Sequence, residues 1–255
     1  MPQGILVLCV AAFVAGFIDA IIGGGGLIQT PAVLITLPKY PVATLLGTTK
    51  IPSFIGTSMA AMQYSKIVQL RWKLLAMMCS IALLAAYGGS KMVSMVSNSF
   101  MKPIIFGMLI IVAVYTWSNK NFGIAALKKN RSKHEWLFAG IFALIIGFYD
   151  GFIGPGAGSF LVLFFIGVLG FDFLKASAHA KFVNLATNMG SIIFFGGSGH
   201  ILFQYALPMA ICNFGGSILG ARLAILKGNN FIRIFFLLII AGTLIRFGYD
   251  IFFRS

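Results

Sequence analysis

Residues 16–28 read GFIDAIIGGGGLI, and residues 147–160 read GFYDGFIGPGAGSF. The two stretches align without a gap when Gly16 is placed on Gly147, and the same shift places Lys50 on Lys181. Each copy therefore holds an acidic residue, a glycine cluster and a later lysine in segments that are otherwise apolar. A duplicated apolar chain with glycine breaks and ionisable residues at corresponding positions is typical of secondary transporters built from two repeats.

The composition predicts an integral membrane protein. Of the 255 residues, 59% are hydrophobic and 9% are charged, and the mean hydropathy is +0.98. Too little polar surface is available to solvate a globular protein of this length. The apolar runs approach or exceed the roughly 17 to 25 residues that cross a bilayer as a helix, and they lack the alternating pattern of membrane barrels. We therefore predict an all-α protein that spans the lipid bilayer.

The charged residues and cysteines exclude several other classes. The net charge of +14 comes from Lys and Arg scattered at segment ends, which indicates contact with lipid headgroups and no binding of nucleic acid. The three cysteines are widely spaced and form neither a CxxC motif nor a cluster with histidine. We expect no metal, no cofactor and no catalytic residue, and the sequence does not define an oligomeric state.

Each repeat divides into the same series of apolar segments. Helices of the first repeat, residues 1–118, are predicted at 5–22, 27–37, 44–64, 73–97 and 101–118. Those of the second repeat, residues 136–255, are predicted at 136–153, 158–170, 175–196, 203–228 and 231–253. The segments 27–37 and 158–170 are too short for an ordinary crossing, so they are half-helices or re-entrant segments. The total is then eight to ten membrane segments.

The linker between the repeats, residues 119–135, is polar and contains five basic residues. By the positive-inside rule this linker is cytoplasmic, and so is the loop that carries Lys66, Arg71 and Lys73. The equivalent loop of the second repeat, residues 196–203, has no Lys or Arg and is expected on the opposite side. The opposite charge bias at equivalent loops predicts two repeats of inverted topology, each with an odd number of crossings.

The glycine clusters at residues 23–26 and 154–158 predict helix breaks. Each Gly costs about 1 kcal/mol and Pro about 3 kcal/mol relative to Ala inside a helix. A helix broken at membrane depth exposes backbone groups that must face protein, water or a ligand. If a short helix begins after each break, its amides form an anion site, with Thr30 and Ser159 as capping hydroxyls. The alternative is that the glycines only allow close helix packing.

Two polar stripes begin at the repeated lysines. Residues at i, i+3 and i+7 share one helix face, so Lys50 is aligned with Ser53 and Thr57. In the second repeat Lys181 leads a similar stripe of Asn184 and Asn188. A charge at the centre of a span costs about 2.5 to 3.5 kcal/mol or more, so each lysine is expected to face a cavity and a partner. The alternative is that each lysine reaches the interface by snorkelling.

The aspartates Asp19 and Asp150 precede the two breaks by one turn. They are candidates for coupling-ion binding or for a structural role, in which a carboxylate accepts from exposed amides or neutralises a lysine. His179 occupies the repeat position of Thr48 and is a candidate for substrate contact or proton exchange, with a purely structural role as the alternative. The candidate substrate-binding residues are Lys50, Lys181, Thr48, Thr49, Ser53, Thr57, His179, Asn184, Asn188, Gly24, Gly25, Gly26, Gly156, Gly158 and Ser159.

The motifs at residues 16–28 and 147–160 resemble those of the sulfite exporter TauE/SafE family, also called the 4-toluene sulfonate uptake permeases. Residues 46–50 and 176–184 resemble the segment that follows each glycine motif in this family. The resemblance covers nearly the whole chain. It implies a multi-pass carrier of the plasma (inner) membrane, with sulfite, thiosulfate and organosulfonates such as sulfoacetate as the substrate class.

The leading hypothesis is a secondary transporter that moves a small sulfur oxyanion by alternating access. Two cationic groups, small hydrogen-bond donors and two helix N-termini favour such an anion. An inside-negative potential favours anion export by about 2.3 kcal/mol per charge per 100 mV, so uptake would need a coupled cation, H+ or Na+. The alternatives are an anion channel and, from a different class, a membrane-embedded sulfur or lipid transferase.

Overall fold

The computed structural model of the protein describes residues 4–97, 107 and 134–253. The predicted all-helical architecture is confirmed, since the described residues form eight helices and no strand. The helices are α1 Ile5–Ile22, α2 Gly26–Thr36, α3 Val42–Ser65, α4 Trp72–Met95, α6 Glu135–Phe152, α7 Ala157–Gly167, α8 Phe173–Gly197 and α9 Phe203–Phe253. The predicted boundaries agree with these to within one turn. The predicted helix at 101–118 and the linker up to residue 133 lie outside the described residues.

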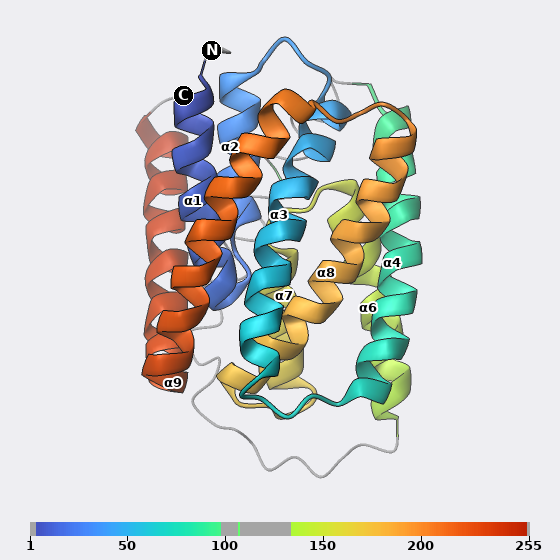
Figure 1. The fold of residues 1–255 in the computed structure, drawn as a ribbon, viewed down its shortest axis with the longest axis vertical. Coiled ribbons are helices and arrows are strands. Elements are labelled where there is room, and N and C mark those ends of the chain that lie inside the picture. The colour runs from blue at the N-terminus through green and yellow to red at the C-terminus, as the bar shows by residue number, and fades with distance from the viewer. Residues whose placement is uncertain (1–3, 98–106, 108–133, 254–255) are drawn as a thin grey trace.

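The last helix contains the break that the sequence predicts between residues 228 and 231. Within α9 the backbone is non-helical at Gly228, where φ is 69° and ψ is −163°. Only glycine adopts this combination without strain. In Figure 1 the chain reverses direction within α9. Both arms contact α1 at Phe17, the first arm through Gly220 and the second through Phe235.

Four helices of the described part are long and apolar enough to cross a membrane. They are Ile5–Ile22, Trp72–Met95, Glu135–Phe152 and the first arm of α9, Phe203–Gly228. Their outward side chains are apolar: Leu6, Leu84 and Ile211 are exposed by 74%, 71% and 74%. An apolar surface of this kind suits lipid as the surrounding solvent. Helices α3 and α8 are similarly long but carry the predicted lysine stripes.

The two short helices return along the helices that precede them (Figure 1). At one end of the molecule, a Cβ placed on Gly4 before α1 would overlap Thr36 at the end of α2. At the other end, Arg71 forms an ion pair with Glu135 at the start of α6 and lies 5.9 Å from the ring of Phe171, just after α7. Each glycine break therefore forms the tip of a helical hairpin, and the two tips meet inside the molecule.

The tips touch through bare backbone. A Cβ on Gly23 would overlap Gly158, and a Cβ on Gly26 would lie 3.1 Å from the Cα of Pro155. Gly23, Gly154 and Gly156 also have φ of 82°, 94° and 83°, which side-chain-bearing residues rarely adopt. Both readings of the glycine clusters thus apply, because the same residues break the helices and allow close packing.

Two further helix pairs, α1 with α9 and α4 with α6, join the halves through glycine. A Cβ on Gly89 of α4 would overlap the carbonyl oxygen of Phe148 in α6, and a Cβ on Gly220 of α9 would overlap that of Phe17 in α1. These are the same contact in both repeats, because the shift that relates the repeats places Gly89 on Gly220 and Phe17 on Phe148. The first helix of each repeat therefore packs on the fourth helix of the other.

Adjacent glycines in α4 test this packing. Gly89→Ala should lower the free energy of unfolding by about 1–3 kcal/mol, because the new methyl group overpacks a backbone contact. Gly88→Ala should be neutral or stabilising by up to about 1 kcal/mol, because nothing lies within 4 Å of the new Cβ and Ala favours helix. Thermal unfolding of both variants in detergent makes the comparison, and equal shifts in the two would contradict the assigned α4–α6 contact.

Candidate functional site

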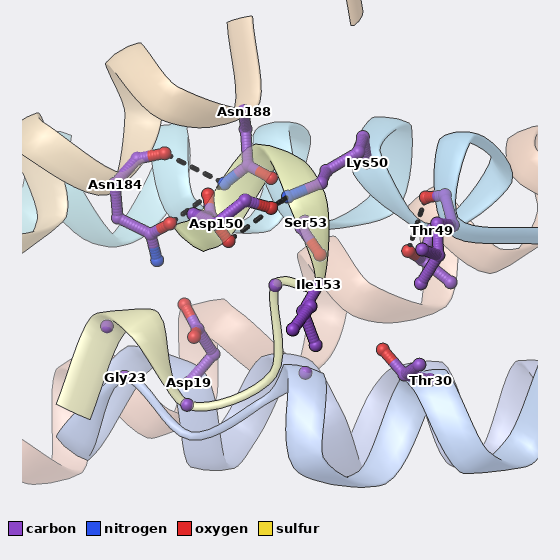
Figure 2. A pocket seen from close by; sticks show the side chains of 15 residues that line it. Asp19, Gly23, Thr30, Thr49, Lys50, Ser53, Asp150, Ile153, Asn184 and Asn188 are labelled. Carbon is purple, nitrogen blue, oxygen red and sulfur yellow. Dashed lines mark hydrogen bonds and ion pairs between the residues drawn. The ribbon is translucent and has the colours of Figure 1, made fainter. Parts of the chain in front are cut away.

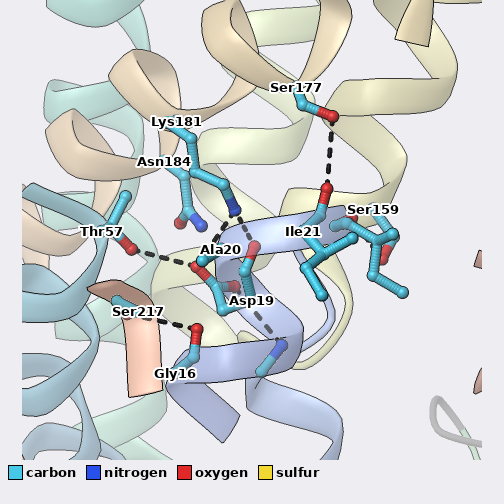
Figure 3. Close-up of polar contacts among 12 residues, drawn as sticks. Gly16, Asp19, Ala20, Ile21, Thr57, Ser159, Ser177, Lys181, Asn184 and Ser217 are labelled. Carbon is cyan, nitrogen blue, oxygen red and sulfur yellow. Dashed lines mark hydrogen bonds and ion pairs between the residues drawn. The ribbon is translucent and has the colours of Figure 1, made fainter. Parts of the chain in front are cut away.

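Two buried ion pairs cross between the halves of the molecule (Figures 2 and 3). In the first, Lys50 Nζ lies 3.1 Å from Asp150 Oδ1 and donates to the Asp150 carbonyl oxygen at 2.6 Å. In the second, Lys181 Nζ lies 3.2 Å from Asp19 Oδ2 and also donates to the Asp19 carbonyl oxygen. The side chain of Lys181 is only 1% exposed. Each lysine is therefore neutralised by the aspartate of the other repeat and does not snorkel to a surface.

The lysines also cap the broken helices. The last carbonyls of a helix have no partner within it, and its C-terminal end carries partial negative charge. The four carbonyls from Asp19 to Ile22 at the end of α1 each receive a side-chain donor: Lys181, Tyr64, Ser177 and Ser159, in that order. At the end of α6, Asp150 O receives Lys50 and Gly151 O receives Ser90. Six carbonyls at the ends of α1 and α6 thus receive side-chain donors.

The starts of the short helices differ from the prediction. Their N-cap residues are Gly25 and Gly156, and neither helix has a side-chain cap. The expected capping role of Thr30 and Ser159 is wrong, since Ser159 instead donates to the Ile22 carbonyl at 3.2 Å. At the start of α2, Asp19 Oδ1 accepts from Gly25 N at 3.3 Å. Asp19 therefore combines the two structural duties that the sequence suggested for it.

A small cavity lies where the hairpin tips meet the lysine helices (Figure 2). Its volume is about 30 Å³. This is room for a few water molecules. The cavity is lined by Asp19, Gly23, Gly26, Thr30, Leu46, Thr49, Lys50, Ser53, Asp150, Ile153, Gly154, Gly156, Gly158, Asn184 and Asn188.

Most of the residues predicted from the two stripes come together here. Lys50 and Ser53 line the cavity from α3, and Asn184 and Asn188 line it from α8. The Asn188 amide group donates to Asn184 O at 2.8 Å and to Asn184 Oδ1 at 3.0 Å. Thr57 is not part of the cavity lining, but its hydroxyl donates to Oδ2 of the lining residue Asp19 at 3.2 Å. Lysine ammonium, hydroxyl and amide groups around one cavity form a donor set suited to an oxyanion.

Other predicted residues lie outside the cavity lining. Gly24 and Gly25 belong to the hairpin tip, and Lys181 and Ser159 hold the end of α1. His179 lies toward the end of the molecule at which α8 begins. There its Nε2 accepts from Arg71 N at 3.1 Å, and its Nδ1 is 2.7 Å from Lys175 O. Since a backbone N–H donates to Nε2, the ring is neutral with its proton on Nδ1.

Thr48 forms the equivalent hydrogen bonds at the opposite end of the molecule. Its hydroxyl accepts from Leu202 N at 3.0 Å and donates to Thr44 O at 2.7 Å. Leu202 and Arg71 occupy equivalent positions of the two repeats, and both directly precede a fourth helix. Thr48 and His179 therefore tie the lysine helix of one repeat to the loop before the fourth helix of the other.

A group of buried polar side chains on α2 and α9 was absent from the prediction. Gln29 on α2, 1% exposed, donates to Thr49 O at 3.2 Å and accepts from Asn213 Nδ2 at 3.1 Å. Ser217 adds a bond from its hydroxyl to Gly16 O at 3.2 Å. The sequence feature that could have indicated this group is the glutamine at position 29, within a largely apolar half-helix. The side chains of Gln29, Asn213 and Ser217 therefore link α2 to α9 and α9 to α1, next to the cavity-lining residue Thr49.

Comparison with known proteins gives one family and several relatives. The family model described as Sulfite exporter TauE/SafE matches residues 8–247. A "Probable membrane transporter protein" of Sinorhizobium sp is 36% identical over 230 residues, which are 89% of this chain and 85% of the relative. One of Haemophilus influenzae is 34% identical over 232 residues, covering 89% and 88%. One of Escherichia coli is 32% identical over 246 residues, covering 96% and 89%. No solved structure matches the chain significantly.

The second ion pair is expected to be a determinant of stability. Lys181→Gln should lower the free energy of unfolding by about 3–5 kcal/mol, because it leaves the Asp19 carboxylate buried without its counterion. Adding Asp19→Asn should recover part of the loss. Thermal unfolding in detergent of the two single variants and the double variant forms the cycle. Lys175→Gln, in the first turn of the same helix, is the control, and an equal loss there would contradict the assignment.

Proposed function

The chain belongs to the sulfite exporter TauE/SafE family, and we propose that this membrane transporter is an alternating-access carrier for a small sulfur oxyanion. The substrate class is sulfite, thiosulfate or an organosulfonate, and the membrane is the plasma (inner) membrane. The observation that carries the proposal is the buried cavity at which two broken helices and the stripe led by Lys50 converge. The relatives are named as transporters, which agrees with a function that is not enzymatic.

The repeats have inverted topology in this proposal. The support is that α1 begins beside the end of α2 at one end of the molecule, whereas α6 begins beside Arg71 and Phe171 at the other (Figure 1). The hairpins α1–α2 and α6–α7 are then re-entrant from opposite sides of the membrane. Residues 1–118 and 136–255 are the two repeats. Carriers with such repeats place substrate where the interrupted helices meet.

The end of the molecule that holds Arg71 and Glu135 is assigned to the cytoplasm. The basic linker, residues 119–135, leads directly into α6 at this end. Lys66 directly follows α3, and Lys73 lies in the first turn of α4, on either side of Arg71. The opposite end holds residues 198–202, which contain neither Lys nor Arg. This distribution follows the positive-inside rule.

The chemistry of the cavity favours a compact oxyanion. Lys50 supplies a cation, Ser53 a hydroxyl group and Asn184 an amide, and the helices after the two breaks direct their N-termini toward the same region. Each of these groups donates hydrogen bonds to oxygen, and the helix dipoles favour negative charge. An apolar substrate would make no use of these donors.

Alternating access is supported by two hydrogen bonds between the repeats, one at each end of the molecule, which we call ties. At one end Thr48 holds the loop before α9, and at the other His179 holds the loop before α4. Each tie is one hydrogen bond between the halves, reinforced at the cytoplasmic end by the ion pair of Arg71 with Glu135. Releasing one tie while the other remains would open the cavity to a single side.

Substrate recognition is tested by thermal shift of the purified protein with sulfite, thiosulfate, sulfoacetate, taurine and sulfate. Sulfur oxyanions should raise the unfolding temperature, because a ligand that binds only the folded state stabilises it by mass action. Chloride at equal ionic strength is the control. No shift with any of the five anions would count against an oxyanion carrier.

Transport is tested in proteoliposomes with the anion that gives the largest shift. Lys50→Gln should reduce saturable flux by a factor of about 10 to 100, because a charge-assisted bond to a buried anion is lost. The flux is compared at equal amounts of folded protein, because this change also leaves Asp150 without its counterion. Lys91→Gln, an exposed lysine of the same repeat, should transport normally. Unchanged flux in a Lys50→Gln/Lys181→Gln double variant would overturn the site, and an unsaturable conductance would indicate a channel.

A further inference from the structure

The carboxylates of the two ion pairs differ in how many partners they have. Asp19 uses both oxygens, since Oδ1 accepts from Gly25 N and Oδ2 accepts from Thr57 and Lys181. Asp150 Oδ1 pairs with Lys50, but Asp150 Oδ2 is buried and has no hydrogen-bond partner among the residues that the structure describes. Asp150 is 4% exposed and lines the cavity. A buried carboxylate oxygen without a donor points to a ligand or a proton.

One part of this difference is visible in the sequence. Asn188 is the residue of the second repeat that is equivalent to Thr57. Its amide nitrogen is turned to Asn184, with bonds of 2.8 Å and 3.0 Å, and so makes no bond to Asp150. The second repeat therefore has a cavity-lining aspartate whose counterpart in the first repeat is fully hydrogen-bonded.

We infer that Asp150 Oδ2 is the site that takes up a coupling proton when an anion binds to Lys50. The inference rests on the proposed function, because it assumes that an oxyanion enters this cavity. Lys50 has three donors and already gives two of them to Asp150. An anion that joins Lys50 would stand beside a second negative charge, the Asp150 carboxylate. Protonation of the carboxylate removes this repulsion, and Oδ2 is the oxygen left free for it.

The charge and atom balance is that of an anion–proton symporter. A hydronium ion on the side of anion arrival gives its proton to Asp150 Oδ2 and leaves as water, so that Asp150 becomes a neutral carboxylic acid. Lys50 keeps its three protons and pairs with the anion. On the opposite side the anion leaves, the acid gives its proton to water, and the Lys50–Asp150 pair forms again. A monoanion then crosses without net charge, and the membrane potential no longer opposes its uptake. A dianion such as thiosulfate crosses with one net negative charge, so the potential opposes its uptake by half as much.

A proton suits this site better than Na+. Sodium needs several oxygen ligands, and its charge would stand beside the Lys50 ammonium, 3.1 Å from the same carboxylate. A proton needs one free oxygen and a path of water, for which the cavity has room. Asp19 is not equivalent to Asp150 in this respect, because a proton there would displace the Thr57 or Lys181 bond.

The test counts protons during anion binding. Thiosulfate is the first probe, because it keeps its charge across neutral pH whereas sulfite does not. Calorimetry of the full-length protein in two sodium-free buffers of different ionisation enthalpy gives the number of protons taken up per anion. The wild type should take up about one, and its thiosulfate affinity should fall about tenfold per pH unit as the proton becomes scarce. Asp150→Asn should bind with no proton uptake and no pH dependence.

Asp172→Asn is the matched control. Asp172 caps α8 by accepting from Lys175 N at 2.9 Å and lies outside the cavity lining, and Asn caps helices equally well. This variant should keep the uptake of one proton. If Asp150→Asn does not fold, infrared difference spectra of the wild type serve instead, and thiosulfate should induce a new carboxylic acid band.

The outcomes separate the inference from the proposed function. Binding of thiosulfate without proton uptake or without the acid band, proton uptake that persists in Asp150→Asn, or a requirement for Na+ would overturn the inference and leave the carrier intact. If thiosulfate does not bind, the anion that shifts the unfolding temperature most replaces it. If none of the five anions binds, the proposed function fails and the inference fails with it.

Discussion

The exchange of lysine and aspartate between the two repeats is the constraint on which the rest of the structure depends. A helix broken inside a membrane leaves carbonyls without partners, and a lysine buried there needs a counterion. One arrangement meets both needs, because each lysine donates to a carboxylate and to the main-chain carbonyl of the same aspartate. Since the aspartate always belongs to the other repeat, neither half can satisfy its own broken helix.

The helices and their breaks follow from local sequence, which is why they were predictable. Glycine and proline act on their own backbone, so the dense clusters at residues 23–26 and 154–158 break the helices locally. The composition of the site was also predictable, because ionisable residues in apolar helices must meet partners. The pairing of Lys50 with Asp150 was not, since the repeated pattern is equally consistent with a pair inside each half. Only the packing of α1 on α9 and of α4 on α6 decides between them.

The unpredicted features are those that depend on distant backbone. Gly88 and Gly89 are neighbours in sequence, yet only Gly89 meets the backbone of Phe148. His179 serves a loop, and its partner Arg71 N is 108 residues away in the chain. Ser159 follows a glycine break as a cap would, but the nearest acceptor is a carbonyl of α1. Sequence pattern defines what such a side chain can donate or accept, and the fold determines which atom it reaches.

The repeat positions that have diverged are those whose hydrogen bonds more than one type of side chain can form. Thr48 and His179 differ, although both accept from a loop amide and both have a ring or hydroxyl atom bonded to the carbonyl four residues earlier. Any compact side chain with one donor and one acceptor meets that need. The positions of Lys50 and Asp150 allow no such freedom, because a buried charge requires the opposite charge as well as hydrogen bonds. The two repeats therefore share their ion pairs, and they differ in the polar groups around them.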